Sequence, residues 1–176
     1  GCIPNFYQEM KPRLYLDIFY SLVTNMDINR AVILMGPRRV GKTVLLYHTI
    51  ARLLAEGVPQ QNIIYISIET PIYNKIYLEH LFNLSKQTLG KEENDQSKYY
   101  VFFDEIQYLK DWEVHLKSLV DTYRSTKFVA SGSATAALKM KSNESGAGRF
   151  TDFMLPPLTF FEFLHLQQLP SDLLLP

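Results

Sequence analysis

One eight-residue segment constrains this chain more than any other feature of its sequence. Residues 36–43 read Gly-Pro-Arg-Arg-Val-Gly-Lys-Thr and fit the pattern G-x-x-x-x-G-K-[ST], in which the backbone N–H groups of a glycine-rich turn surround a phosphate. We expect Gly36 and Gly41 to take positive φ angles and to bring the backbone close to the phosphate. Lys42 is expected to contact the β- and γ-phosphates, and the Thr43 hydroxyl to bind Mg²⁺.

The sequence on either side of this loop agrees with a phosphate-binding role. An uninterrupted apolar run, residues 31–35, precedes the loop and has the length of a buried strand. Apolar residues recur at helical spacing after the loop, and Gly57 and Pro59 mark the end of that helix. This context disfavours the alternative, a plain glycine-rich turn with a solvated basic cluster. The predicted nucleotide-binding residues are Gly36, Pro37, Arg38, Arg39, Val40, Gly41, Lys42 and Thr43.

A pair of acids ends a second apolar strand further along the chain. Residues 99–103 are apolar, and Asp104 and Glu105 follow them directly. Carboxylates at the end of a buried strand are costly unless they have a task there. We therefore assign Asp104 to Mg²⁺ binding and Glu105 to the general base that activates the attacking water. The alternative is that both acids cap the next turn, which the upstream phosphate loop disfavours.

Three further polar residues are candidates for catalysis. Ser131 follows a predicted strand, residues 127–130, and is placed to orient the water or to contact the γ-phosphate. Ser133 is the second choice, and a plain Ser-Gly turn is the alternative for both. Arg149 follows a glycine-containing loop, from which an arginine can act as an arginine finger in cis or in trans. A solvated surface arginine is the alternative there. The predicted catalytic residues are Glu105, Ser131 and Arg149.

Hydrophobic periodicity divides the rest of the chain into alternating strands and helices, which predicts a parallel sheet with helices on both faces. Residues 1–12 are expected to be irregular. A helix that begins at Lys11-Pro12 is expected to carry Leu14, Ile18, Ser21 and Leu22 on one face, with Tyr15, Phe19 and Val23 adjoining. The other expected strands are 62–68 and 153–155. The other expected helices are one with Tyr77, Leu81, Leu84 and Thr88 on one face, one capped by Asp111, one at 134–139, and one at 160–167 capped by Thr159.

Composition narrows the function classes. The net charge is +0, with 18 basic and 18 acidic residues, so no general attraction to nucleic acid is indicated. No apolar run reaches the ~20 residues that span a membrane, and a single cysteine excludes an internal disulfide. The first residue is glycine and the last residues are an apolar run, from which we expect a piece of a longer protein. The cytoplasm, which holds ATP and Mg²⁺, is the expected location.

Taken in order, the motifs resemble a group of prokaryotic AAA-type ATPases that have an N-terminal ATPase core and a separate C-terminal domain. The motifs are GPRRVGKT, FFDEIQ, SGS, GR and LPPLTFFEF, which extend from about residue 30 to residue 164. The resemblance implies a P-loop NTPase three-layer α/β/α sandwich with a parallel five-stranded sheet of order 5-1-4-3-2. It also implies a Walker A loop at 36–43, Walker B acids at Asp104 and Glu105, a sensor at Ser131 and the Gly-Arg arginine at Arg149.

The resemblance further implies a domain organisation and a set of ligands. Residues 1–30 are expected to form an N-terminal helical segment and residues 31–170 the ATPase core. The family's small helical lid and C-terminal domain are expected to be absent, which leaves adenine covered only by a segment around residues 11–30. The expected ligands are ATP and Mg²⁺. A protein partner or the C-terminal domain is an expected partner, an oligomer is compatible with the resemblance, and neither membrane nor nucleic acid is indicated.

The expected function is Mg²⁺-dependent ATP hydrolysis that drives a conformational switch. The alternative is a nucleotide-dependent interaction or regulatory module with negligible turnover. A kinase that shares the phosphate loop is a third class, and it would need an arginine-rich lid over its acceptor, which the sequence does not show.

Overall fold

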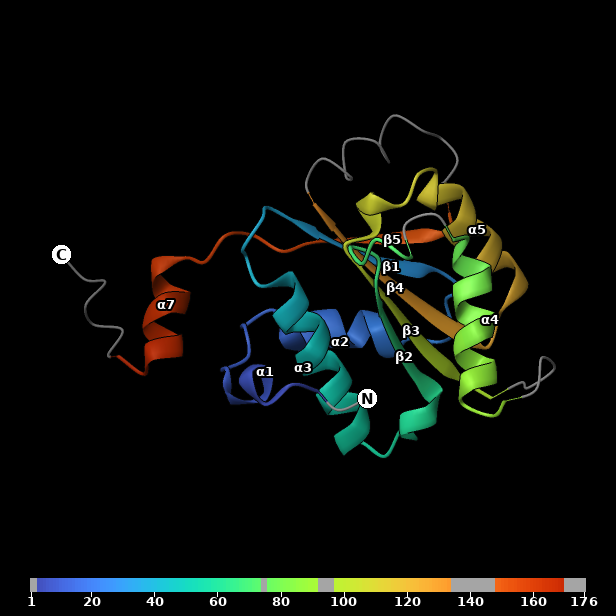
Figure 1. Ribbon diagram of the computed structural model, residues 1–176. Helices are drawn as coiled ribbons and strands as arrows, with labels where there is room; N and C mark the ends of the chain where they lie inside the picture. The colour runs from blue at the N-terminus through green and yellow to red at the C-terminus, as the bar shows by residue number, and fades with distance from the viewer. Residues whose placement is uncertain (1–2, 74–75, 92–96, 134–147, 170–176) are drawn as a thin grey trace.

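A single parallel sheet forms the centre of the molecule, as Figure 1 shows for the computed structural model. The structure describes residues 3–73, 76–91, 97–133 and 148–169. The strands are β1 (Ala31–Gly36), β2 (Ile63–Ser67), β3 (Tyr99–Asp104), β4 (Thr126–Ser133) and β5 (Phe150–Met154). They pair in the order β2-β3-β4-β1-β5, all parallel. Read from β5, this is the predicted order 5-1-4-3-2. Because all the strands are parallel, their carboxyl ends lie together at one end of the sheet, which we call its carboxyl edge.

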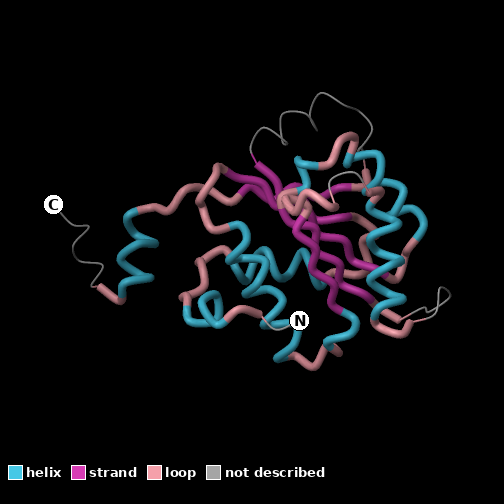
Figure 2. The backbone as a smooth tube through the Cα atoms, in the orientation of Figure 1, coloured by secondary structure: helices cyan, strands magenta, loops and turns pink. Residues whose placement is uncertain are grey.

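Helices cover both faces of this sheet (Figure 2). The α-helices in the described part of the chain are α1 (Asn5–Glu9), α2 (Leu16–Thr24), α3 (Lys42–Ala55), α4 (Leu78–Thr88), α5 (Trp112–Thr122) and α7 (Phe160–Gln167). Alternate residues of β1 enter opposite layers, because side chains of a strand alternate between its faces. Ile33 and Met35 join the core beneath α4 and α5, whereas Val32 and Leu34 join the core beneath α2 and α3. The three-layer α/β/α prediction is confirmed.

Helix α7 lies on one side of the molecule, at the end of an extended segment that leaves β5 (Figure 1). Its bounds agree with the predicted helix at 160–167. The side chain of Thr159 accepts a hydrogen bond from the backbone N–H of Glu162, so the predicted N-cap is also confirmed. The helix therefore has a sharply defined beginning that places Glu162 in its first turn.

The N-terminal prediction needs two corrections. Residues 5–9 are helical rather than irregular, and α2 begins at residue 16 instead of at residues 11–12. Helix α2 buries Phe19, Tyr20 and Val23, whereas Leu14 and Ile18 are exposed. The helix carries two apolar stripes, and a local pattern cannot choose between them. The ring of Phe19 packs edge-on against that of Phe153, 5.1 Å between centroids, and this contact across the fold selects the buried stripe.

Three other local predictions differ in detail. Helix α4 buries Leu78, Leu81 and Phe82, while the predicted face residues Tyr77 and Leu84 are exposed. Asp111 occupies the position before α5 as predicted, but it has left-handed backbone angles and its side chain makes no capping hydrogen bond. Strand β5 begins three residues before the predicted strand 153–155, because its pairing with β1 begins at Ala31. The predicted helix at 134–139 lies outside the described residues.

Candidate nucleotide-binding site

The glycine-rich loop joins β1 to α3 at the carboxyl edge of the sheet, between Gly36 and Lys42. Gly41 has a φ of 92°, which is the expected left-handed conformation. The reason predicted for Gly36 is wrong, because its φ is not positive. A Cβ there would lie 2.5 Å from the backbone oxygen of Leu155. Gly36 is therefore needed for the close approach of the segment that follows β5.

Lys42 places a buried positive charge within this loop. Its side chain is 5% exposed, and its ammonium donates to the backbone oxygens of Gly36 (3.2 Å) and Pro37 (3.0 Å). Among the described residues no carboxylate pairs with this ammonium. Because a buried charge with neutral partners alone is costly, the loop fits an anion, as the phosphate interpretation requires.

The Asp104 carboxylate is the centre of a polar cluster at the end of β3. The side chain is 2% exposed. One oxygen, Oδ2, accepts hydrogen bonds from the hydroxyls of Thr43 (2.9 Å) and Tyr65 (2.7 Å). The other, Oδ1, accepts from the hydroxyl of Ser131. The fold thus brings together the two residues predicted to bind Mg²⁺, and a carboxylate beside a hydroxyl supplies the hard oxygen ligands that this ion prefers.

The Tyr65 hydroxyl belongs to this cluster and was missed in the sequence. Tyr65 lies on β2, at the register position opposite Phe102. Burial, and then the nearby charge of Asp104, raise the pKa of Tyr65 well above its ordinary value. The hydroxyl therefore stays protonated and donates a hydrogen bond to the Asp104 carboxylate. The ring of Tyr47 packs against that of Tyr65, 4.8 Å between centroids. Buried and half-buried residues alternate along β2, and a tyrosine in such a strand does not by itself indicate that its hydroxyl bonds to a carboxylate.

We expect Tyr65→Phe to lower the free energy of unfolding by about 1.5–3 kcal/mol, the usual contribution of a hydrogen bond to a charged group. The ring and its packing stay, so the loss reports the hydroxyl that faces Asp104. Urea unfolding followed by circular dichroism measures it. Tyr108→Phe, which alters an exposed tyrosine, is the control, and equal stability of Tyr65→Phe and wild type would contradict the prediction.

Glu105, the predicted general base, is held by contacts on both its backbone and its side chain. It takes left-handed backbone angles, and its N–H donates to the hydroxyl of Ser131 (3.1 Å). The carboxylate accepts from the side-chain amide of Gln107. The oxygen of that amide accepts the backbone N–H of Ser133 (3.1 Å). Ser131 therefore contacts the predicted metal ligand. Ser133 is linked to the base through Gln107, a residue that the sequence did not single out.

Arg149 lies at the end of the sheet where the strands begin, opposite to the end that carries the phosphate loop. Its carbonyl accepts the N–H of Ala31 at the start of β1 (2.9 Å), and its guanidinium pairs with the Asp121 carboxylate (3.0 Å). The phosphate loop begins after Gly36, about 17 Å further along the strand at ~3.3 Å per residue. The structure does not bring Arg149 to the phosphate loop of its own chain. Arg38 and Arg39 lie on the loop and are exposed.

A cavity of about 650 Å³ opens beside the phosphate loop. Its walls come from the N-terminal segment, the loop, and the region of α7. The lining residues are Met10, Lys11, Arg13, Arg39, Val40, Gly41, Val44, Pro157, Leu158, Leu166 and Gln167. From the sequence, adenine was expected to be covered only by the segment before β1. In the structure, the walls of this cavity come both from that segment and from the segment after β5.

The fold and the loop together define a class of protein: an α/β P-loop core with a parallel five-stranded sheet. A family model described as "AAA domain" matches residues 28–164. The chain therefore belongs to the AAA domain family, and its core is a nucleotide-binding core of AAA type.

Two relatives match most of this chain. An uncharacterized protein of Haemophilus influenzae is 28% identical over 152 residues, which are 86% of this chain and 37% of the relative. An uncharacterized protein of Methanocaldococcus jannaschii is 32% identical over 166 residues, which are 91% of this chain and 33% of the relative. The chain thus spans about a third of the length of these relatives.

The Hsp104:casein complex of S. cerevisiae, in its extended conformation, shares the fold with a TM-score of 0.62 at 13% identity. The likeness covers 92% of this chain and 30% of that one. Within the described residues, no helix is both long and apolar enough to cross a membrane.

Proposed function

We propose that this chain binds ATP with Mg²⁺ and hydrolyses it, and that the nucleotide cycle drives a change of shape. The observation that carries the proposal is the polar cluster at the carboxyl edge of the sheet. There the Lys42 ammonium lacks a carboxylate partner among the described residues, and the Thr43 hydroxyl lies 2.9 Å from the Asp104 carboxylate. Glu105 follows Asp104 directly. Membership of the AAA domain family supports the proposal.

Each residue of the cluster has a definite task in this proposal. Thr43 and Asp104 would hold Mg²⁺, which when bound neutralises phosphate charge. Lys42 would bind phosphate oxygens together with the backbone N–H groups of the loop. Glu105 would accept the proton of the attacking water. Ser131 would keep the Asp104 carboxylate in a fixed orientation through its hydrogen bond.

We propose that the nucleobase binds in the cavity beside the loop. Its flat aromatic ring would lie between Met10 on one wall and Leu158 and Leu166 on the other. We propose further that residues 31–170 form the ATPase core with residues 1–30 as its N-terminal helical segment. In this proposal the protein works in the cytoplasm, with a protein partner or a C-terminal domain.

A second candidate is a nucleotide-dependent interaction module with negligible turnover. The hydrogen bond between Gln107 and the Glu105 carboxylate favours it, because a base held by an amide is not free to reach water. Binding of Mg·ATP by calorimetry and steady-state phosphate release decide between the two. Binding with turnover supports the ATPase, binding without turnover supports the module, and no binding contradicts both.

We expect Arg149→Ala to lower kcat while leaving the affinity for ATP unchanged. The guanidinium is too far from the loop of its own chain, so it would act on a neighbouring subunit and only in the transition state. Steady-state kinetics measure the effect, with Arg124→Ala, an exposed arginine before β4, as the control. Mixing Arg149→Ala with Lys42→Ala should restore activity, because each variant then supplies the residue that the other lacks. An unchanged kcat would leave Arg149 as a surface residue.

A further inference from the structure

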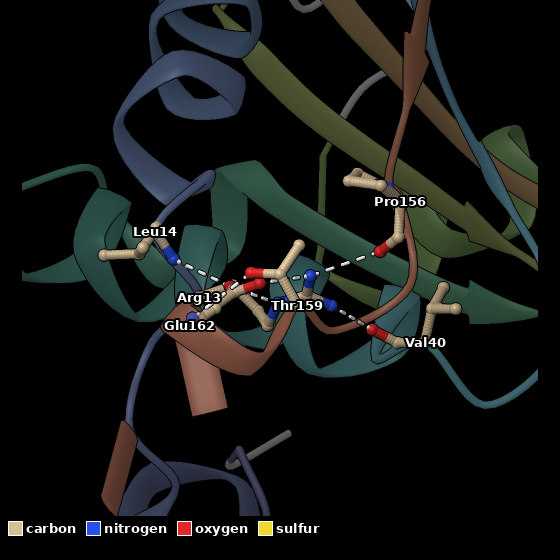
Figure 3. A network of polar contacts seen from close by, with 6 residues as sticks. All are labelled: Arg13, Leu14, Val40, Pro156, Thr159 and Glu162. Atoms are coloured by element: carbon tan, nitrogen blue, oxygen red, sulfur yellow. Dashed lines mark hydrogen bonds and ion pairs between the residues drawn. The ribbon is translucent and has the colours of Figure 1, made fainter. Parts of the chain in front are cut away.

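The motif LPPLTFFEF after β5, residues 155–163, contributes Glu162 to a buried ion pair that has no task in the proposed function. Figure 3 shows the network, in which Arg13 from the N-terminal segment meets Glu162 of α7 beside the phosphate loop. Arg13 is 7% exposed and Glu162 is 1% exposed. The residues of the network are Arg13, Leu14, Val40, Pro156, Thr159 and Glu162. Because breaking a buried ion pair is strongly unfavourable, this contact ties together segments that are far apart in the sequence.

The Arg13 guanidinium has partners on three sides. Its Nε and Nη2 atoms donate to the two carboxylate oxygens of Glu162, the latter at 2.7 Å. Nη2 also donates to the backbone oxygen of Pro156 (3.2 Å). Nη1 donates to the backbone oxygen of Val40 (2.5 Å), within the phosphate loop. Arg13 therefore connects α7 to the loop through one rigid, planar group.

The contact with Val40 fixes the orientation of a loop peptide. The carbonyl of Val40 and the N–H of Gly41 belong to the same planar trans peptide, so they point in opposite directions. With the carbonyl held by Arg13, the N–H of Gly41 is turned away from the guanidinium. We propose that Arg13 and Glu162 are positioning residues that orient the phosphate loop, so that the docking of α7 sets the affinity of the loop for phosphate.

Helix α7 is suited to such control, because only two of its eight residues are buried. Glu162 and Leu164 are its buried residues, whereas the phenylalanines of the helix are exposed. Those exposed rings are Phe160, Phe161 and Phe163. The ion pair is thus a main attachment of α7, and coupling between the two sites is reciprocal. A nucleotide that tightens the loop should also hold α7 more firmly.

Hydrogen exchange of the wild-type protein tests this reciprocity, which rests on the proposed nucleotide binding. We expect saturating Mg·ATP to slow exchange both at loop residues 36–43 and at α7 residues 160–167. Slower exchange in the loop with unchanged exchange in α7 would overturn the inference and leave the proposed function intact. Unchanged exchange at both segments would overturn both.

Variants test the positioning role itself. The double variant Arg13→Met/Glu162→Leu removes both charges and keeps apolar volume, a replacement that buried ion pairs often tolerate. We expect it to bind Mg·ATP and inorganic triphosphate at least about tenfold more weakly than wild type, a change that corresponds to ~1.4 kcal/mol. Inorganic triphosphate restricts the measurement to the phosphate contacts.

Controls separate positioning from general stability. Arg52→Met removes an exposed ion pair with Asp17 and should leave both affinities unchanged, and Glu162→Gln, which keeps an acceptor for Arg13, should fall between wild type and the double variant. Thermal melting shows whether each variant is folded. A folded double variant with wild-type affinity for triphosphate would overturn the proposal, and if the double variant does not fold, the exchange experiment decides.

Discussion

Lys42→Ala is expected to weaken the binding of Mg·ATP by at least about tenfold. A charge-assisted hydrogen bond contributes about 1.5–3 kcal/mol, and ~1.4 kcal/mol already changes a dissociation constant tenfold. In the structure the Lys42 ammonium is buried and bonded to two backbone oxygens. A phosphate would replace these neutral partners by an opposite charge in a site with little water, where the attraction is strongest.

Isothermal titration calorimetry of the wild type and the variant measures the loss. The matched control is Lys98→Ala, which removes an exposed lysine that precedes β3 and so lies toward the opposite edge of the sheet. The control should bind Mg·ATP as wild type does. Equal affinity of Lys42→Ala and wild type would refute the phosphate-loop interpretation, because no other residue of the loop carries a buried positive charge.

Glu105→Gln is expected to slow ATP hydrolysis by about 10²-fold or more, while binding of Mg·ATP stays close to that of the wild type. General-base catalysis contributes typically 10²–10⁴-fold, and an amide has the size of the carboxylate but cannot accept the proton. The backbone of Glu105, which bonds to Ser131, is unchanged by this replacement. The effect should therefore fall on the chemical step.

Single-turnover hydrolysis and calorimetry, performed on the same preparations, separate the two effects. Asp104→Ala is the contrasting variant. It removes the carboxylate that meets Thr43 and should weaken binding in the presence of Mg²⁺ more than in its absence. If Glu105→Gln retained wild-type turnover, Glu105 would not be the base, and another acceptor would have to be sought around Gln107.

Elements with a strong local pattern were predicted well. The β1–loop–α3 unit carries an apolar run, two glycines and a helical repeat, and the structure has a strand, a loop and a helix at these places. The Thr159 cap of α7 was also found from its residue type. The face that α2 buries was not predicted, because the helix has two apolar stripes. The stripe that is buried is the one whose Phe19 packs against Phe153, far along the chain.

The sequence by itself determined the phosphate loop, the strand that ends in Asp104 and the alternation of strands and helices, since these depend on spacing between near neighbours. Only the tertiary structure decided which distant groups meet. It brought Tyr65 to Asp104 and Arg13 to both Glu162 and Val40, and it placed Arg149 at the far edge of the sheet. These meetings depend on the order in which parallel strands pair and on how helices pack over them, and no local pattern of residues records either one.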